Sequence, residues 1–376
     1  MFYLTVVARR AIYGIFSAIF PIKKINWNKE EMSDKPVCQN GNKSRRLLLT
    51  GAAGFIGYHT FKKMRSLGWD VLGIDNVNDY YDVSLKKARL AQLGFKEDYA
   101  TGKMLTSADG GRFMMMSLED RDALPSLFKQ EGGFDVVCNL AAQAGVRYSL
   151  EAPFTYVDSN VSGFLNVLEC CRNYGVQHLV YASSSSVYGE SGKPPFSTEQ
   201  KCDAPASLYA ATKKCNELMA HCYTSLFGFP TTGLRFFTVY GPWGRPDMAL
   251  FKFTRGMLEG KEINVYNNGQ MKRDFTYVDD IVEGISRILE RPALGGARVY
   301  NIGHGSPVQL LDFIRAIEEC TGCSAKMKMM PMQPGDVLTT WADTTALQED
   351  YGYTPTTGIR EGVASFVKWY REFYKI

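Results

Sequence analysis

The sequence predicts an α/β fold, with a Rossmann-type doubly wound parallel sheet and a smaller C-terminal α/β substrate domain. Short apolar runs alternate with helix-length amphipathic stretches from residue 46 onward, which is the pattern of consecutive β-α-β units. The first apolar run ends in a glycine-rich turn that opens a helix. With 376 residues, 45% of them hydrophobic and 22% charged, the chain is long enough for one large and one smaller globular domain.

The larger domain is expected to alternate strands and helices along the chain. Its first unit has a strand at 47–50, a helix at 55–67 and a second strand at 70–75. The later strands share short, mostly apolar runs, at 134–140, 178–182 and 231–235. A helix at 358–375 is expected to close the chain.

Composition sets the expected domain boundaries. Residues 1–45 form an N-terminal extension and linker, and a dinucleotide-binding domain follows over 46–240, with 271–303 returning to it. Residues 241–270 and 304–376 are expected to form the substrate domain.

Residues 1–46 carry nine Lys or Arg and three Asp or Glu, a net charge of +6, so the remaining 34 basic and 36 acidic residues give −2. The folded body therefore has no basic surface suited to nucleic acid.

The N-terminal extension and the spacing of the cysteines indicate where in the cell the protein is expected. The apolar stretches within residues 1–24 are shorter than the roughly 20 residues that span a bilayer, and Arg9 and Arg10 interrupt them. We expect a cytoplasmic protein, with weak membrane contact through residues 1–24 as the alternative. The nine cysteines lack the spacing of a disulfide framework. Cys320 and Cys323 have no second pair of ligands nearby, so no metal site is expected.

A glycine motif predicts a dinucleotide site. Gly51, Gly54 and Gly57 follow the first expected strand, where glycines let the backbone approach a pyrophosphate at the helix N-terminus. Asp75 closes the second strand, and a carboxylate there binds the adenosine ribose and repels a 2′-phosphate. We therefore predict NAD as the cofactor. The expected contacts from these two segments are Gly51, Gly54, Phe55, Ile56, Gly57, Asp75 and Asn76.

The glycine spacing, G-x-x-G-x-x-G, resembles that of the extended short-chain dehydrogenases, which include sugar-nucleotide epimerases, dehydratases and decarboxylases. Residues 139–144 (NLAAQA) are similar to the family's strand end over the cofactor, and Asn160 matches the start of its N-V-x-G helix. The resemblance implies cofactor contacts at Ala141 and Asn160. Ser117 stands where the family usually has an acidic residue against the adenine, so the chain departs from the pattern there.

Tyr209 and Lys213 lie one turn apart on one face of an expected helix. Tyrosine is a weak base at neutral pH because its ordinary pKa is about 10, and a neighbouring ammonium favours the phenolate. Ser184 lies three residues before Val187 of a V-Y-G segment. The resemblance implies that Tyr209 removes the proton of the sugar O4, that Ser184 positions that oxygen, and that Lys213 holds the cofactor ribose. NAD accepts the C4 hydride.

Two further segments resemble the uronate branch of the family's epimerases, 75–82 (DNVNDYYD) and 234–248 (LRFFTVYGPWGRPDM). The resemblance implies a UDP-sugar substrate with a C6 carboxylate, which needs cationic and hydroxyl donors. The implied carboxylate ligands are Ser185, Ser186, Thr238 and Arg245. Arg273 matches the family residue that binds the UDP pyrophosphate, and Asp336 matches the one that meets the uridine ribose.

The family's dehydratases carry an Asp-Glu pair just after the catalytic hydroxyl, because elimination needs a further acid and base, and its decarboxylases tend to carry a Glu. Here Ser185 and Ser186 stand there. The resemblance therefore implies 4-epimerisation of UDP-glucuronate to UDP-galacturonate. A neutral UDP-glucose 4-epimerase, a UDP-glucuronate decarboxylase and a non-catalytic NAD-binding sensor are the alternatives. The resemblance also implies a homodimer formed through helices at 153–174 and 206–227.

Overall fold

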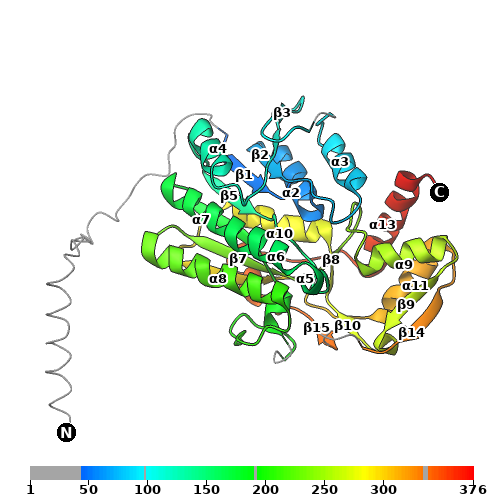
Figure 1. The fold of residues 1–376 in the computed structure, drawn as a ribbon. Helices are drawn as coiled ribbons and strands as arrows, with labels where there is room; N and C mark the ends of the chain where they lie inside the picture. The colour runs from blue at the N-terminus through cyan, green and yellow to red at the C-terminus, as the bar shows by residue number, and fades with distance from the viewer. Residues whose placement is uncertain (1–43, 97–98, 190–192, 333–337) are drawn as a thin grey trace, which may run out of the picture. The chain divides into compact units, whose positions relative to one another are not determined.

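An eight-stranded sheet forms the centre of the larger part of the molecule (Figure 1). The computed structural model describes residues 44–96, 99–189, 193–332 and 338–376, which belong to one compact unit, Ser44–Ile376. The strand order is β12-β7-β6-β5-β1-β2-β4-β3, and each neighbouring pair is parallel except β3 with β4. The strands are β1 (Arg46–Thr50), β2 (Asp70–Asp75), β3 (Met104–Thr106), β4 (Arg112–Met115), β5 (Val136–Asn139), β6 (His178–Ser184), β7 (Thr231–Phe236) and β12 (Ala297–Ile302).

The strand order reverses between β1 and β5. From β1 the chain builds through β2 and β4 toward one edge, then returns to β5 and builds through β6 and β7 toward the other. Ligands of open α/β sheets bind in the crevice at the carboxyl ends of the strands at such a switch point. Gly51 follows β1 directly, so the fold brings the glycine turn to this crevice.

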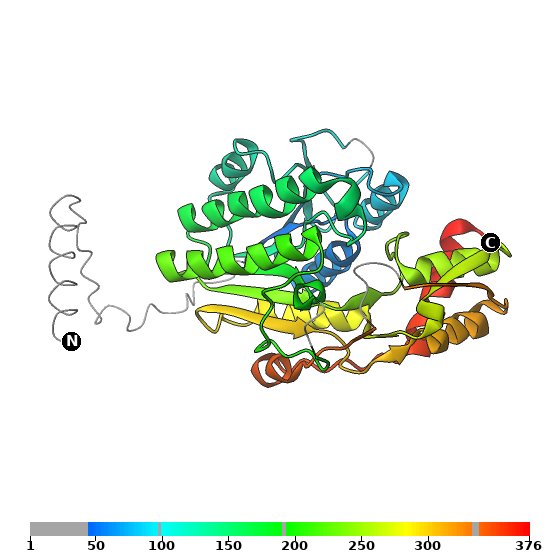
Figure 2. The same ribbon diagram turned by 60° about the horizontal axis from the view of Figure 1, so that its bottom comes forward.

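Helices cover both faces of the sheet, as Figures 1 and 2 show. Successive side chains of β1 enter different cores, because strand residues alternate between the two faces. Leu48 packs in the core that includes residues of α4 and α7, whereas Leu47 and Leu49 pack in the core that includes residues of α2 and α10. The helices are α2 (Phe55–Ser66), α3 (Val83–Gln92), α4 (Ala123–Glu131), α7 (Gly163–Asn173), α8 (Leu208–Phe227) and α10 (Val278–Glu290).

The C-terminal part consists of small sheets and helices beside the carboxyl ends of the strands. Strands β8 (Thr238–Tyr240) and β11 (Phe275–Tyr277) pair in parallel, as do β9 (Glu262–Tyr266) and β14 (Lys326–Met330). Strand β10 (Lys272–Arg273) lies between β13 (Val308–Gln309) and β15 (Thr339–Thr340). The helices are α9 (Ala249–Leu258), α11 (Leu310–Thr321), α12 (Thr345–Tyr351) and α13 (Ile359–Tyr374).

The predicted fold class is confirmed. One local expectation needs correction: the helix predicted over 153–174 is divided into α6 (Pro153–Val157), a π-helical turn η1 (Asp158–Ser162) and α7. The proposed division into domains stays a prediction. No helix among the described residues is both long and apolar enough to cross a bilayer. The predicted extension lies almost entirely outside the described residues, as does the membrane contact through residues 1–24.

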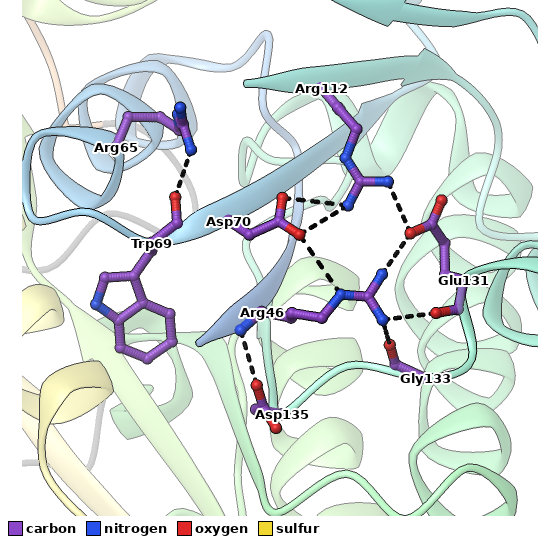
Figure 3. Close-up of polar contacts among 8 residues, drawn as sticks. All are labelled: Arg46, Arg65, Trp69, Asp70, Arg112, Glu131, Gly133 and Asp135. Carbon is purple, nitrogen blue, oxygen red and sulfur yellow. Dashed lines mark hydrogen bonds and ion pairs between the residues drawn. The ribbon is translucent and has the colours of Figure 1, made fainter. Parts of the chain in front are cut away.

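Four charged side chains clamp the amino ends of the central strands (Figure 3). The guanidinium of Arg112 lies 3.2 Å from both oxygens of Asp70 and 2.7 Å from Glu131 Oε2. Arg46 pairs with the same two carboxylates, at 3.5 Å from Asp70 Oδ2 and in direct contact with Glu131. All four side chains are at most 29% exposed. The network joins β1, β2, β4 and α4 at the end of the sheet opposite the crevice.

Replacing Arg112 by methionine is expected to lower the free energy of unfolding by about 2 kcal/mol, because two partly buried carboxylates lose a shared cation. Chemical denaturation of the variant and the wild type measures this. Arg315→Met is the control, because Arg315 pairs with Asp312 at an exposed site and should change stability by less than about 0.5 kcal/mol. Equal losses in the two variants would contradict a structural role for the network.

Candidate active site

A single cavity of about 1320 Å³ opens at the carboxyl ends of the central strands and extends to α9 and β9. It gathers most of the predicted site residues, from segments far apart in the sequence. Those lining it are Gly51, Gly54, Phe55, Ile56, Gly57, Asp75, Asn76, Ala141, Ser184, Ser185, Ser186, Tyr209, Lys213, Thr238, Arg245 and Arg273. Asn160 lies outside this lining. Asp336 falls outside the described residues.

The glycine turn forms a cradle that no side chain could share. A Cβ on Gly57 would lie 1.9 Å from the carbonyl oxygen of Gly51, and one on Gly51 would lie 2.8 Å from the amide nitrogen of Ala141. Gly54 caps α2 without a side-chain hydrogen bond, and the first turn of α2 contains no acidic residue. The N-terminus of α2 therefore carries no acidic side chain of its own, which fits the pyrophosphate of a dinucleotide.

Asp75 is fixed by the backbone of the same turn. Its carboxylate accepts hydrogen bonds from the amides of Ala53 (3.1 Å) and Val77 (2.7 Å). Lys86, on α3, also lines the cavity and donates to the carbonyl (2.8 Å) and side-chain (2.6 Å) oxygens of Asn78. Burial lowers the pKa of Lys86, and the charge of Asp75 partly offsets this. Sequence reasoning missed Lys86, because nothing in a lone helical lysine distinguishes it from a solvent-exposed one.

An acidic group does lie near the expected adenine position, two residues beyond Ser117. Glu119 lines the cavity and accepts hydrogen bonds from Ser117 and from Ser159 Oγ, the latter at 2.6 Å. The hydroxyl of Ser117 thus orients a carboxylate and does not replace it. Matching the sequence to the family position by position could not find Glu119, because Glu119 lies two residues beyond the matched position. The loop after β4 places its carboxylate in the cavity.

Tyr209 and Ser184 form the centre of the candidate catalytic group. Burial raises the pKa of Tyr209, whereas a hydrogen bond with Ser184 and the charge of Arg245 lower it. Ser184 ends β6 and also accepts hydrogen bonds from the amide (3.2 Å) and hydroxyl (2.9 Å) of Ser186. The tyrosine hydroxyl therefore lies beside a hydroxyl that can hold a reacting oxygen, and Arg245 lines the same cavity.

Lys213 lines the same cavity as Tyr209, and its effect on the tyrosine stays a prediction. Its ammonium is 2% exposed and donates to the carbonyl of Ala182 at 2.9 Å. Burial lowers the pKa of Lys213 to about 7. Ser184 and the charge of Arg245 both lower the pKa of Tyr209, against the effect of burial.

Asn160 supports the wall of the cavity from behind. It lies in the π-helical turn, is 2% exposed, and exchanges hydrogen bonds with the backbone of Gln143 at 2.8 and 3.0 Å. Its amide also donates to Thr212 Oγ1 at 3.1 Å. Since Gln143 follows β5 and Thr212 precedes Lys213, Asn160 ties the strand-end loop to α8. Direct contact of Asn160 with the cofactor stays a prediction.

A buried ion pair holds α8 against the sheet one turn beyond Lys213. Glu217 and Arg235 form two hydrogen bonds of 2.8 Å, and both side chains are 4% exposed. Glu217 also accepts from Ser183 Oγ at 2.7 Å. Ser183 also lines the cavity, and its hydroxyl joins β6 to α8 through Glu217. This pairing fixes the register between Tyr209 and Ser184.

Arg245 is paired within the cavity wall. Its guanidinium donates to Asp247 from Nε (3.0 Å) and Nη2 (2.5 Å), and Tyr80 Oη donates to Asp247 Oδ2 at 3.2 Å. Arg245 also lies over the Tyr80 ring, 5.8 Å from its centroid. The charge of Arg245 keeps the pKa of Asp247 low in spite of burial. Neither Tyr80 nor Asp247 was singled out from the sequence.

Additional cations line the end of the cavity near the C-terminal part. Lys252 and Arg255 lie on α9, and Arg147 lies 4.8 Å from the centroid of the Tyr266 ring. Burial is the largest cause of the lowered pKa of Lys252; the charge of Asp247 opposes it, and those of Arg147, Arg255 and Arg245 add to it. Like charges repel one another, so this gathering of cations favours an anion in the cavity. No group of metal-ligating side chains occurs among the described residues.

Comparisons with known proteins agree with this geometry. Residues 47–303 match the model of the NAD dependent epimerase/dehydratase family. The chain is 52% identical to Protein CapI of Staphylococcus aureus, over 88% of this chain and 99% of that protein. It is 44% identical to UDP-glucuronate 4-epimerase 4 of Arabidopsis thaliana, over 93% of this chain and 80% of that one.

Solved structures of sugar-nucleotide epimerases are also similar to this chain. The crystal structure of UDP-glucuronic acid 4-epimerase from Bacillus cereus, in complex with UDP-glucuronic acid and NAD, matches with a TM-score of 0.78 at 32% identity, covering 88% of this chain and all of that one. The predicted cofactor, NAD, is confirmed by the family and by the NAD held in such relatives. The chain therefore belongs to the NAD dependent epimerase/dehydratase family.

Proposed function

We propose that this protein is a sugar-nucleotide epimerase that interconverts UDP-glucuronate and UDP-galacturonate at C4. The observation that carries the proposal is that Tyr209, Ser184, Arg245 and the glycine cradle line one cavity, in which Ser184 is hydrogen-bonded to Tyr209. Relatives named UDP-glucuronate 4-epimerase, at 44% and 32% identity, support the choice of substrate.

The chain's own residues move and hold the proton of the sugar O4. Tyr209, as the phenolate, removes this proton, and Ser184 holds the oxygen through its hydroxyl. Lys213, on the same helix, is proposed to hold the cofactor ribose. When bound, NAD supplies the acceptor for the C4 hydride and the source for its return. Tyr209 then gives the proton back to O4 on the inverted carbon, so the reaction needs no further acid or base.

The sugar carboxylate is proposed to bind at Arg245, assisted by hydroxyl donors. Arginine presents five N–H groups in a planar fork that fits a carboxylate. The supporting donors are Ser185, Ser186 and Thr238, all of which line the cavity. The hydroxyls of Ser185 and Ser186 lack the acid–base capacity that elimination requires. Together these groups hold an acid sugar without promoting loss of its substituents.

The diphosphate is proposed to lie among the cations that line the cavity near α9 and β10. Arg273, the last residue of β10, lines the cavity, and Arg147, Lys252 and Arg255 add positive charge from two other segments. These cations are proposed to bind the diphosphate together with Arg273, because charge-assisted hydrogen bonds to phosphate are strong. Contact of Asp336 with the uridine ribose stays a prediction, because that residue falls outside the described residues.

Product analysis tests the proposal. The full-length protein with NAD is incubated with UDP-glucuronate, and the nucleotide sugars are resolved by chromatography. UDP-galacturonate as the product, without carbon dioxide, is the expected result. A UDP-pentose would indicate a decarboxylase, and faster conversion of UDP-glucose to UDP-galactose would indicate a neutral-sugar epimerase. Binding of NAD with no turnover of any of these sugars would indicate the sensor.

A homodimer is proposed from the apolar surface of the helices at 153–174 and 206–227. Large exposed side chains gather there, among them Phe154 (81%), Leu218 (58%) and Leu226 (68%). Leu218→Glu is expected to yield monomers, because a charge in an apolar contact is costly to bury. Light scattering coupled to size-exclusion chromatography measures the mass. Leu294→Glu, at an exposed apolar residue outside these helices, is the control, and dimers in both variants would contradict the interface.

A further inference from the structure

The two segments that resemble the uronate branch meet at one carboxylate. Tyr80 belongs to the segment 75–82 and Asp247 to the segment 234–248, 167 residues further along the chain. The hydroxyl of Tyr80 and the guanidinium of Arg245 both donate to Asp247. The side chains of Arg245 and Asp247 are only 22% and 28% exposed, and all three residues line the cavity.

The backbone that carries Arg245 is fixed independently of this pair. Arg89 is fully buried and donates to the carbonyl of Trp243 from Nε (3.2 Å) and Nη2 (2.7 Å). It also binds the carbonyl of Ala53 at 2.9 Å and the hydroxyl of Tyr81 at 2.6 Å. The turn before Arg245 is therefore anchored to α3 and to the glycine loop. Because Arg89 already holds this turn, Asp247 is not needed to anchor it. We therefore look for the function of Asp247 in its negative charge beside Arg245.

A resident carboxylate matters because epimerisation must expose both faces of C4. The hydride leaves one face of the carbon and returns to the opposite face, so the sugar ring must change its orientation toward a fixed acceptor. A carboxylate held by Arg245 must then release it. An arginine left unpaired in a partly buried site costs several kcal/mol, which would oppose the release. Asp247 already occupies two of the five N–H donors.

We propose that Asp247 is a specificity-determining counter-ion that competes with the sugar carboxylate for Arg245. It weakens the grip on the acid sugar and keeps Arg245 paired while the ring turns. Tyr80 sets the strength of this competition, because its hydroxyl stabilises the Asp247 carboxylate when Arg245 turns to the sugar. The inference rests on the proposed function, since it requires a substrate with a carboxylate.

Binding measurements without turnover test the competition. In full-length Tyr209→Phe protein with NAD, calorimetric titration compares UDP-glucuronate with UDP-glucose. Adding Asp247→Asn, which removes the charge and keeps the shape, is expected to raise affinity for UDP-glucuronate about tenfold and to change affinity for UDP-glucose less than about twofold. Tyr80→Phe is expected to act in the opposite direction and weaken UDP-glucuronate binding, because Asp247 then depends more on Arg245.

Turnover adds a second readout. In the protein with Tyr209 intact, Asp247→Asn is expected to lower both KM and kcat for UDP-glucuronate, because a tighter grip slows the reorientation. Glu259→Gln is the matched control: Glu259 lines the same cavity but pairs with Lys261 at 2.7 Å. That variant should alter binding of the two sugars equally. In an Arg245→Ala background the effect of Asp247→Asn should vanish.

Two outcomes would overturn the inference. One is weaker UDP-glucuronate binding in Asp247→Asn, which would make Asp247 only an anchor for Arg245. The other is an equal change for both sugars, which would make its effect a general one of charge. If the Tyr209→Phe protein without further changes binds UDP-glucuronate no better than UDP-glucose, the proposed function fails instead. Tyr80→Phe is expected to weaken UDP-glucuronate binding, whereas Asp247→Asn is expected to strengthen it. If one of these variants is poorly folded, the other still tests the inference.

Discussion

Replacing Tyr209 by phenylalanine is expected to lower kcat about 10³-fold, with binding of NAD and sugar nucleotide retained. The phenylalanine keeps the ring and its packing but removes the oxygen that takes the O4 proton, and positioned acid–base groups contribute roughly 10² to 10⁴ in rate. Initial rates with UDP-glucuronate measure kcat, and calorimetry measures the affinity. A variant that turns over as fast as the wild type would show that the base is a different residue.

Tyr156→Phe is the matched control for this change. The ring of Tyr156 packs against that of Tyr209, with the centroids 6.0 Å apart. Its hydroxyl, however, donates to the carbonyl oxygens of Ala144 (3.0 Å) and Gly145 (2.6 Å), so it serves the loop after β5. We expect kcat of Tyr156→Phe within about fivefold of the wild type. A loss as large as that of Tyr209→Phe would indicate that both tyrosines take part in proton transfer.

The parts of the site that sequence predicted are those built from neighbouring residues. Gly51, Gly54 and Gly57 lie within one turn, and Tyr209 and Lys213 lie one helical turn apart. Local spacing and the alternation of strands and helices fix such groups before any tertiary contact is known. The same alternation predicts a parallel sheet whose strands end at one edge, which is why both the fold class and the crevice were predictable.

The parts that sequence missed are contacts between distant segments. Asp247 meets Tyr80 across 167 residues, and Arg89 meets Trp243 across 154. No periodicity or motif specifies such pairs, because each depends on how separate loops pack. The π-helical turn around Asn160 was missed for a related reason: its register is set by hydrogen bonds to Gln143, on another element.

Arg245 shows how the same limit affected the chemistry. Its sequence context assigned it to the substrate carboxylate alone, and Lys213 was expected to act on Tyr209. In the structure, Arg245 lowers the pKa of Tyr209, while Lys213 binds the carbonyl of Ala182. The effect of Arg245 on Tyr209 depends on the tertiary arrangement, so the sequence context alone could not predict it.

Replacing Arg245 by alanine is accordingly expected to impair the acid sugar far more than a neutral one. Loss of a charge-assisted partner in a partly buried site costs about 3–4 kcal/mol, so kcat/KM for UDP-glucuronate should fall roughly 10²- to 10³-fold. For UDP-glucose, which lacks the carboxylate, the loss should stay below about tenfold. Steady-state kinetics with both sugars measure the ratio. Arg255→Ala is the control, because a diphosphate contact is common to both substrates and its loss should affect them alike.

The pH dependence of the same variant separates the two roles of Arg245. A nearby positive charge stabilises the phenolate and lowers the pKa of Tyr209. Removing that charge must raise this pKa, so the acid limb of the kcat/KM profile should move to higher pH for UDP-glucose as well as for UDP-glucuronate. Carboxylate binding cannot produce a shift with the neutral sugar. An acid limb that stays in place with UDP-glucose would therefore confine Arg245 to substrate recognition, and Tyr209 would owe its ionisation to Ser184 and the bound ligands.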